Sequence, residues 1–202
     1  MSRPSPSVRR GASARTLRII GGLWRGRRLR FPSSPEIRPT PDRVRETLFN
    51  WLAARVPGAR CLDLFAGSGA LGLEALSRGA AHVTFVERDP AAAREIAARL
   101  AEWGTQAASV ERADARGFLQ RAPGAPFDIA FLDPPFAATL LDETAARLEQ
   151  GGWLTNGALI YVECPAAAAP RLPAGWAPVK AKRAGEVGYH LYSRAARGTD
   201  NE

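Results

Sequence analysis

The stretch LDLFAGSGALG, residues 62–72, decides the fold class. It predicts a strand, a glycine turn and the start of a helix, and Gly67, Gly69 and Gly72 match the GxGxxG spacing. A second strand-like run follows and ends in Glu87, twenty residues after Gly67. In such a unit the glycines let the backbone approach a ligand, and the acid accepts hydrogen bonds from both ribose hydroxyls. The stretch predicts a nucleoside site; a tight turn without a ligand is the alternative.

Strand and helix patterns alternate around this stretch. Strand-like runs cover residues 60–65, 82–87, 107–112, 127–132 and 158–163, and helix-like runs cover 70–78, 90–103, 115–121 and 140–150. Several strands are continuously apolar, which is typical of a parallel sheet with helices on both faces. The last two runs, 177–183 and 188–193, have no helix between them and predict an antiparallel pair at the sheet edge. We therefore expect an α/β fold with a mostly parallel sheet.

The N-terminal part differs from this body. Residues 1–16 show no periodicity and are predicted to be a disordered basic tail. Residues 17–41 predict an arginine-rich β-hairpin, turning at Gly21-Gly22, and a proline-rich connector. A helix is expected from 42 to 54, so that the main domain spans 42–194 and residues 195–202 form a second disordered tail.

The net charge of +8 is concentrated at the N-terminus. Residues 1–45 hold twelve arginines and two acids, a net +10, whereas the remainder of the chain carries −2. Such asymmetry indicates a polyanionic partner, most often nucleic acid. A solvated basic tail is the alternative.

Composition excludes several classes of protein. The two cysteines, Cys61 and Cys164, lie far apart without CxxC spacing, so a disulfide framework and a zinc ribbon are not expected. Two scattered histidines, His82 and His190, do not suggest a metal site. No apolar run approaches the roughly 18 residues that span a bilayer. We expect a cytoplasmic protein without a metal.

Two cofactors fit the glycine turn. NAD would place its pyrophosphate at the helix N-terminus, whereas S-adenosylmethionine carries an ammonium and a sulfonium group. Asp63, near the end of the first strand, suits those cations and would repel a pyrophosphate, which favours S-adenosylmethionine. Asp114, after the third strand, could bind the adenine amino group or simply cap a helix.

The run FDIAFLDPPF, residues 127–136, ends the fourth strand. Proline cannot continue a central strand, so Asp133 is left at the carboxyl edge of the sheet, where open α/β sheets bind ligands. The Asp133 carboxylate and a carbonyl of the Pro134-Pro135 turn can accept both N–H groups of an exocyclic base amine and orient its lone pair. Phe136 can stack on the flipped base. A turn that merely ends the strand is the alternative.

Five motifs together carry a resemblance to a known family. They are RIIGGLWRGR (18–27), RPTPDRVRETLFNW (38–51), DLFAGSGALGLEAL (63–76), DPPF (133–136) and GYHLY (188–192). The chain resembles class I S-adenosylmethionine-dependent amino-methyltransferases, and within them the bacterial 16S rRNA (guanine-N2)-methyltransferase family, over residues 17–193. The resemblance implies a seven-stranded Rossmann-like fold and a methyl transfer to RNA of an assembled or partly assembled small ribosomal subunit. A monomer is expected.

Residue types and resemblance together yield the expected site. The catalytic residues are Asp133, Pro134, Pro135 and Phe136. The cofactor-binding residues are Arg38, Thr40, Asp63, Phe65, Gly67, Gly69, Glu87 and Asp114. The RNA-binding residues are Arg18, Trp24, Arg25, Arg27, Arg28, Arg30, Arg43, Tyr189 and His190.

Some of these roles have structural alternatives. The resemblance implies that Arg38 to Thr40 fold over the methionine end of the cofactor, with Arg43 shaping the site, but the following helix could be an ordinary amphipathic lid. Tyr189 and His190 could line a base pocket or pack an aromatic strand on the core. Trp24 could stack on a base, although an anchor for the hairpin is favoured.

Three other functions compete with this hypothesis. A DNA adenine amino-methyltransferase shares Asp-Pro-Pro-aromatic, but such enzymes usually need a larger target-recognition domain than this chain has room for. An NAD(P) oxidoreductase could use Arg88 on a 2′-phosphate, but Asp63 and Asp133 argue against it. A non-catalytic rRNA-binding assembly factor would not need the intact turn at Asp133.

Overall fold

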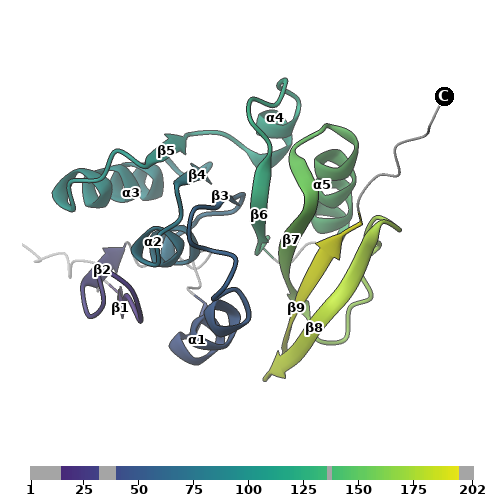
Figure 1. Ribbon diagram of the computed structural model, residues 1–202, viewed down its shortest axis with the longest axis horizontal. Helices are drawn as coiled ribbons and strands as arrows, with labels where there is room; N and C mark the ends of the chain where they lie inside the picture. Colours follow the sequence, from purple (N-terminus) through teal and green to yellow (C-terminus); the bar gives the residue numbers. More distant parts are fainter. Residues whose placement is uncertain (1–14, 32–39, 136–137, 196–202) are drawn as a thin grey trace, which may run out of the picture.

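The computed structural model describes residues 15–31, 40–135 and 138–195 of the chain (Figure 1). Its centre is a seven-stranded sheet in the order β5-β4-β3-β6-β7-β9-β8. The strands are β3 (Arg60–Asp63), β4 (His82–Val86), β5 (Ala108–Glu111), β6 (Phe127–Leu132), β7 (Leu154–Pro165), β8 (Trp176–Ala184) and β9 (Val187–Arg194). The first five strands in that order are parallel, and β9 is antiparallel to both of its neighbours. The expected seven-stranded, mostly parallel α/β fold is confirmed.

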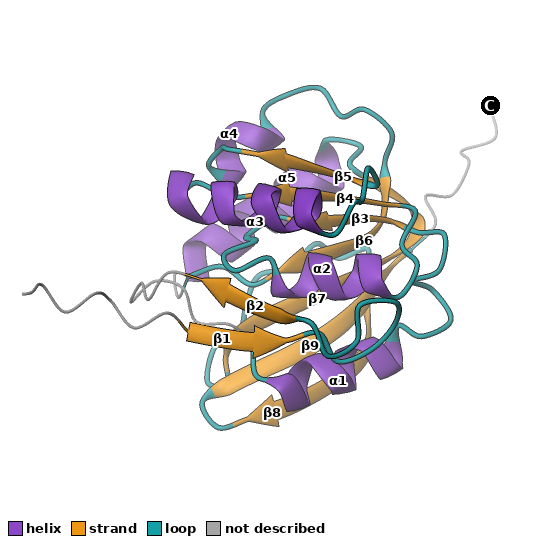
Figure 2. Cartoon of the chain, turned by 90° about the vertical axis from the view of Figure 1, so that its left-hand side faces the viewer, coloured by secondary structure: helices purple, strands orange, loops and turns teal. Residues whose placement is uncertain are grey.

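Helices cover both faces of this sheet (Figure 2). They are α1 (Asp42–Trp51), α2 (Ala70–Ser77), α3 (Pro90–Glu102), α4 (Ala115–Leu119) and α5 (Ala138–Gln150). One core cluster joins the sheet to α1, α2 and α3, and a second joins it to α4 and α5. Successive strand residues point to opposite faces, so Cys61 enters the first cluster and Leu62 the second. This is why the central strands carry apolar residues on both faces, with polar residues such as Asp63 and Asp128 near their ends.

The expected antiparallel pair at the sheet edge is confirmed. β9 lies between β7 and β8, so β8 is the outermost strand at this end of the sheet. The strand expected at 158–163 is longer, since β7 begins at Leu154 and provides seven paired positions for β9. In the described part of the chain no helix is long and apolar enough to cross a membrane.

A separate two-stranded sheet precedes α1. β1 (Arg15–Arg18) and β2 (Arg28–Phe31) are antiparallel, which confirms the hairpin. The expected turn at Gly21-Gly22 is wrong, because residues 19–27 form a longer connection. Gly22 instead lies against α2: its φ is +76°, and a Cβ there would sit 1.8 Å from the Ser77 carbonyl oxygen. The glycines serve close packing on a helix rather than the hairpin turn.

Arg45 is the largest side chain with no exposed surface, and it ties the hairpin to the domain. Its guanidinium donates to the Arg18 carbonyl at 2.8 Å, to Asp42 at 2.6 Å and to the Thr40 carbonyl at 3.2 Å. It also contacts Glu74 of α2 at 3.4 Å. Because Glu74 in turn accepts two backbone N–H groups of the hairpin connection, the buried charge is well compensated.

Candidate active site

A cavity of about 550 Å³ opens at the carboxyl ends of β3, β4, β5, β6 and β7. This volume lies in the usual range for small-ligand sites. The cavity brings together nine of the expected catalytic and cofactor residues: Thr40, Asp63, Phe65, Gly67, Glu87, Asp114, Asp133, Pro134 and Pro135. Arg38 and Phe136 lie outside the described residues. The topology explains the gathering, because the carboxyl ends of parallel strands meet at one sheet edge.

The glycine turn has the backbone that its sequence requires. Gly67 and Gly69 have φ of +53° and +75°, a region that residues with a Cβ rarely adopt, and Gly69 is the N-cap of α2. A Cβ on Gly72 would lie 2.2 Å from Cε1 of Phe85, so this glycine permits close packing of α2 on β4. Gly69 does not line the cavity in the structure; it shapes the turn beside it.

The cavity is strongly acidic. Its described lining contains six acids and one base; the acids are Asp63, Glu87, Asp89, Asp114, Asp133 and Glu163, and the base is Arg88. Asp63 is 3% exposed, and burial raises its pKa to about 7, with Glu87 adding to the rise and the hydrogen bond from the Gly72 N–H opposing it. Such a surface favours a cationic ligand and disfavours a pyrophosphate.

Glu87 is held in place by backbone donors. Its carboxylate accepts the Gly67 N–H at 2.6 Å and the Asp89 N–H at 2.7 Å. Burial raises its pKa despite these bonds. A carboxylate has about four acceptor positions, so two remain for a ligand diol. Asp114 caps α4 by accepting the Arg116 N–H at 2.9 Å, and it also lines the cavity.

Asp133 and Glu163 lie side by side, Asp133 directly after β6 and Glu163 near the carboxyl end of β7. Leu132 of β6 pairs with Val162 of β7, so the next residue of each strand reaches the same edge. Glu163 accepts the Thr40 hydroxyl at 3.0 Å and the Tyr161 hydroxyl at 2.7 Å. Burial, followed by the charges of Glu163 and Asp63, raises the pKa of Asp133 well above its ordinary value.

Glu163 was not among the residues expected from the sequence. The signal was available, because Glu163 is an acid that ends a continuously apolar run, as Asp133 does. The pKa of Glu163 is also raised, chiefly by burial. In the part of the chain that is described, no group of three or more His, Cys, Asp or Glu side chains is placed to hold a metal ion.

Two of the expected RNA-binding aromatics are core residues. Trp24 is 5% exposed and packs on Trp103, the C-cap residue of α3, with ring centroids 4.8 Å apart. It therefore anchors the hairpin and has little surface on which a base could stack. Tyr189 is 4% exposed and stacks on Trp51 of α1 at 5.6 Å. Neither lines the cavity, so packing is the correct alternative for both rings. His190 is half-buried on β9, outside the cavity lining.

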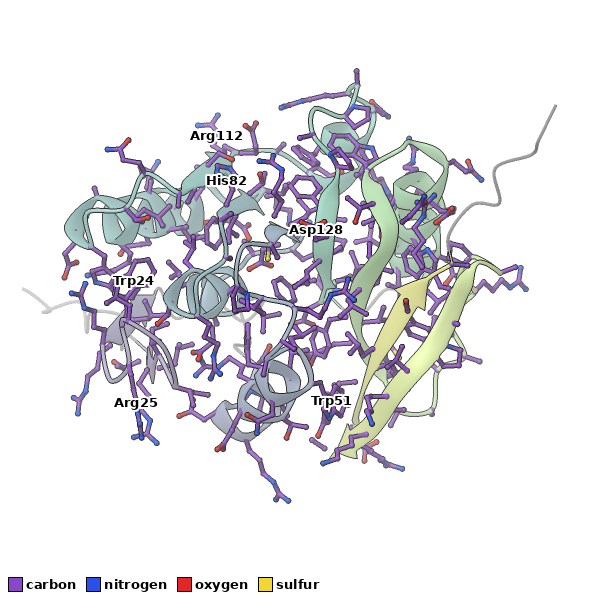
Figure 3. All side chains as sticks on the ribbon, in the orientation of Figure 1. Trp24, Arg25, Trp51, His82, Arg112 and Asp128 are labelled. Atoms are coloured by element: carbon purple, nitrogen blue, oxygen red, sulfur yellow. The ribbon has the colours of Figure 1, made fainter. Side chains whose placement is uncertain are left out.

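The expected arginines whose side chains are described lie on the surface. Arg25 points away from the body, whereas Trp24 lies between the hairpin and α3 (Figure 3). The exposed arginines of this set are Arg18, Arg25, Arg27, Arg28 and Arg43. Arg43 projects from α1 and does not line the cavity. Arg30 lies on β2, and its side chain is outside the described ones.

Comparison with known proteins agrees with the fold and with the family resemblance. The family described as Conserved hypothetical protein 95 matches residues 17–193. Ribosomal RNA small subunit methyltransferase D of Escherichia coli is 52% identical over 183 residues, which cover 90% of this chain and 92% of that protein. The homologous enzyme of the same name from Haemophilus influenzae is 44% identical, covering 87% and 93% of the two chains. The solved structure of Escherichia coli yhhF has a TM-score of 0.85 at 50% identity, covering 90% and 99%.

Proposed function

The chain belongs to the family of ribosomal RNA small subunit methyltransferase D, and we propose that it methylates the N2 amine of one guanine in 16S rRNA. The methyl donor is S-adenosylmethionine. The observation that carries the proposal is the placement of Asp133, Pro134 and Pro135 in the wall of an acidic cavity whose other walls are the glycine turn and Glu87. Base-amine chemistry and nucleoside binding thus share one site.

The residues present suit this cofactor. Asp63 is a buried carboxylate with a raised pKa, so a neighbouring ammonium group would restore its preference for the ionised form. Glu87 keeps acceptor positions for the ribose hydroxyls, and Asp114 can receive the adenine amino group. When bound, S-adenosylmethionine supplies an electrophilic methyl group. Arg38, expected at its methionine end, lies outside the described residues.

The turn at the end of β6 would act on the base amine. The Asp133 carboxylate and the Pro134 carbonyl would accept the two amine N–H groups, which directs the nitrogen lone pair to one side. The nitrogen must lose a proton once it forms its new bond to carbon. The raised pKa of Asp133 makes its carboxylate a suitable acceptor. Phe136, the residue expected to stack on the base, is not described.

The hairpin would hold the RNA backbone. Its exposed arginines lie on a unit whose apolar side chains, including Leu17 and Ile19, are buried in the domain core. Deleting the hairpin would therefore disturb the fold, and substituting its arginines is the cleaner test. Replacing Arg25, Arg27, Arg28 and Arg30 with alanine should weaken RNA binding and leave cofactor affinity unchanged. The slope of log affinity against log salt should fall by about 0.7 to 0.9 for each phosphate contact that is lost.

We further propose a monomeric, cytoplasmic enzyme that acts on a substantially assembled small subunit.

The decisive experiment is mass spectrometry of 16S rRNA nucleosides. A strain lacking the gene should lose N2-methylguanosine at one site, and the wild-type gene should restore it. A gene that encodes the Asp133→Ala variant should produce a folded protein but should fail to restore N2-methylguanosine. An unchanged nucleoside profile in the deletion strain would contradict the proposed function.

A further inference from the structure

The edge strand β8 carries an unusual set of charges. The chain has 28 basic residues, of which only Lys180 and Lys182 are lysines, and both lie on this strand. Both are exposed, and within the described part of the chain neither forms an ion pair with an acid. Arg183 follows them and is also exposed, beside Glu186 at 3.4 Å. The strand thus presents a short basic row at the open edge of the sheet.

The two lysines point to the same side of the sheet. Lys180 pairs with Leu191 and Lys182 with Tyr189, and directly opposed residues share a face. Leu191 and Tyr189 belong to the core cluster beneath α1, so the lysines lie just beyond the face that α1 covers. Residues two apart on a strand are separated by roughly 7 Å, so the two ammonium groups form a row along the edge.

This row leads to the cavity. β8 ends at Ala184, which pairs with Val187 of β9, and Val187 lines the cavity. The arginine-rich hairpin lies on the other side of α1 (Figure 1). Two basic surfaces therefore flank α1, although the sequence beyond residue 45 carries a net negative charge.

We propose that Lys180 and Lys182 form a second phosphate-binding surface, which holds the substrate RNA on the side of α1 opposite the hairpin. This inference rests on the proposed function for the identity of the RNA. Its physical basis is charge complementarity: an ammonium group is a compact cation that binds phosphate without a fixed geometry, and its release of counterions strengthens binding. Two separated contacts would also orient the RNA relative to the cavity, which a single basic arm cannot do.

Lysines on an edge strand have a competing explanation. Charged side chains, especially lysine, prevent one sheet edge from pairing with another. That role predicts that the protein self-associates when the two lysine charges are removed, and that its affinity for RNA does not change. The two explanations therefore differ in what a charge-removing variant does.

The test is a salt titration of RNA affinity for Lys180→Gln/Lys182→Gln, with small ribosomal subunits from a deletion strain and a 16S rRNA transcript as probes. We expect roughly tenfold weaker binding near physiological salt and a log–log salt slope reduced by about 1.4 to 1.8, the value for two phosphate contacts. Lys180→Arg/Lys182→Arg should restore both, because it keeps the charge. The matched control, Arg121→Gln/Arg147→Gln, removes two charges beside α4 and α5 on the opposite face of the sheet and should leave the slope unchanged.

Each outcome decides the proposal. Unchanged RNA affinity and slope for the glutamine variant, with or without self-association in sedimentation velocity, would overturn it. An equal loss in the control would also overturn it, since the effect would then reflect net charge alone. If the wild-type protein binds RNA through β8 but methylates no guanine, the proposed function fails while the surface stands. Calorimetry with S-adenosylhomocysteine should give wild-type affinity for every variant, which shows that the cavity is intact.

Discussion

Replacing Asp63 with asparagine should separate what this residue does for the ligand from what it costs the fold. Asp63 is buried at the end of β3 and accepts the Gly72 N–H at 2.9 Å, a bond that an asparagine oxygen can also accept. Its pKa is raised from 3.8 to about 7, first by burial and then by Glu87. Asp63→Asn keeps the shape and removes the charge.

The magnitudes follow from that pKa. A cationic ligand needs the ionised carboxylate, which is roughly one tenth of the population at pH 6 and nine tenths at pH 8. Affinity of the wild-type protein for S-adenosylmethionine should therefore fall about tenfold from pH 8 to pH 6. Asp63→Asn should bind about 1.5 to 3 kcal/mol more weakly at pH 8, the scale for a hydrogen bond to a charged group, and lose this part of the pH dependence.

The ligand-free protein should become less stable as the pH rises, whereas its affinity for S-adenosylmethionine should increase. Because the folded pKa is above the unfolded value, the protonated form is favoured by folding, and the contribution is complete below about pH 4 and lost as pH rises through about 7. A shift of about three pKa units corresponds to up to about 4 kcal/mol at pH 8. Asp63→Asn should therefore be more stable than wild type at pH 8 and equally stable at pH 4.

Isothermal calorimetry at pH 6, 7 and 8 and urea unfolding at pH 4 and 8 measure the two effects. Asp128→Asn is the matched control, because Asp128 sits at the amino end of β6, away from the cavity, and accepts the Arg60 N–H. It should leave affinity unchanged at every pH. Wild-type affinity that is equal at pH 6 and 8, or an asparagine variant that binds as tightly as wild type, would refute the reasoning.

Three further substitutions test the catalytic turn, the glycine turn and the buried ion pair. Asp133→Ala should bind cofactor normally and lower single-turnover methyl transfer by at least ~10²-fold in rapid-quench assays, the scale for a positioned catalytic group; near wild-type turnover would make the turn structural only. Gly72→Ala places a Cβ 2.2 Å from Phe85 Cε1 and should cost about 1–3 kcal/mol in urea unfolding, and an unchanged midpoint would argue against close packing there. Arg45→Ala leaves Glu74 without its buried cationic partner and should destabilise by about 3–5 kcal/mol, whereas a loss below 1 kcal/mol would show that the pair is dispensable.

The sequence by itself determined the fold class and most of the cavity. The alternation of apolar runs with helical periodicity required a parallel sheet, and the carboxyl ends of parallel strands must meet. Residues that end strands, such as Asp63, Glu87 and Asp133, therefore had to converge whatever the details of packing. The glycine turn was equally readable, because Gly67 adopts a backbone conformation that favours glycine.

Only the tertiary structure decided which side chains are buried between elements distant in sequence. The sequence left base stacking and core packing open for Trp24 and Tyr189, and the structure packs these rings on Trp103 and Trp51. Arg45 looks like one of many surface arginines, yet it has no exposed surface because the hairpin, α1 and α2 close around it. Lys180 and Lys182 lie at the edge of the sheet only because β9 inserts between β7 and β8. The local pattern of apolar and polar residues specifies whether a segment is a helix or a strand and where it ends. Which element packs over a given side chain depends on the spatial order of the elements in the tertiary structure.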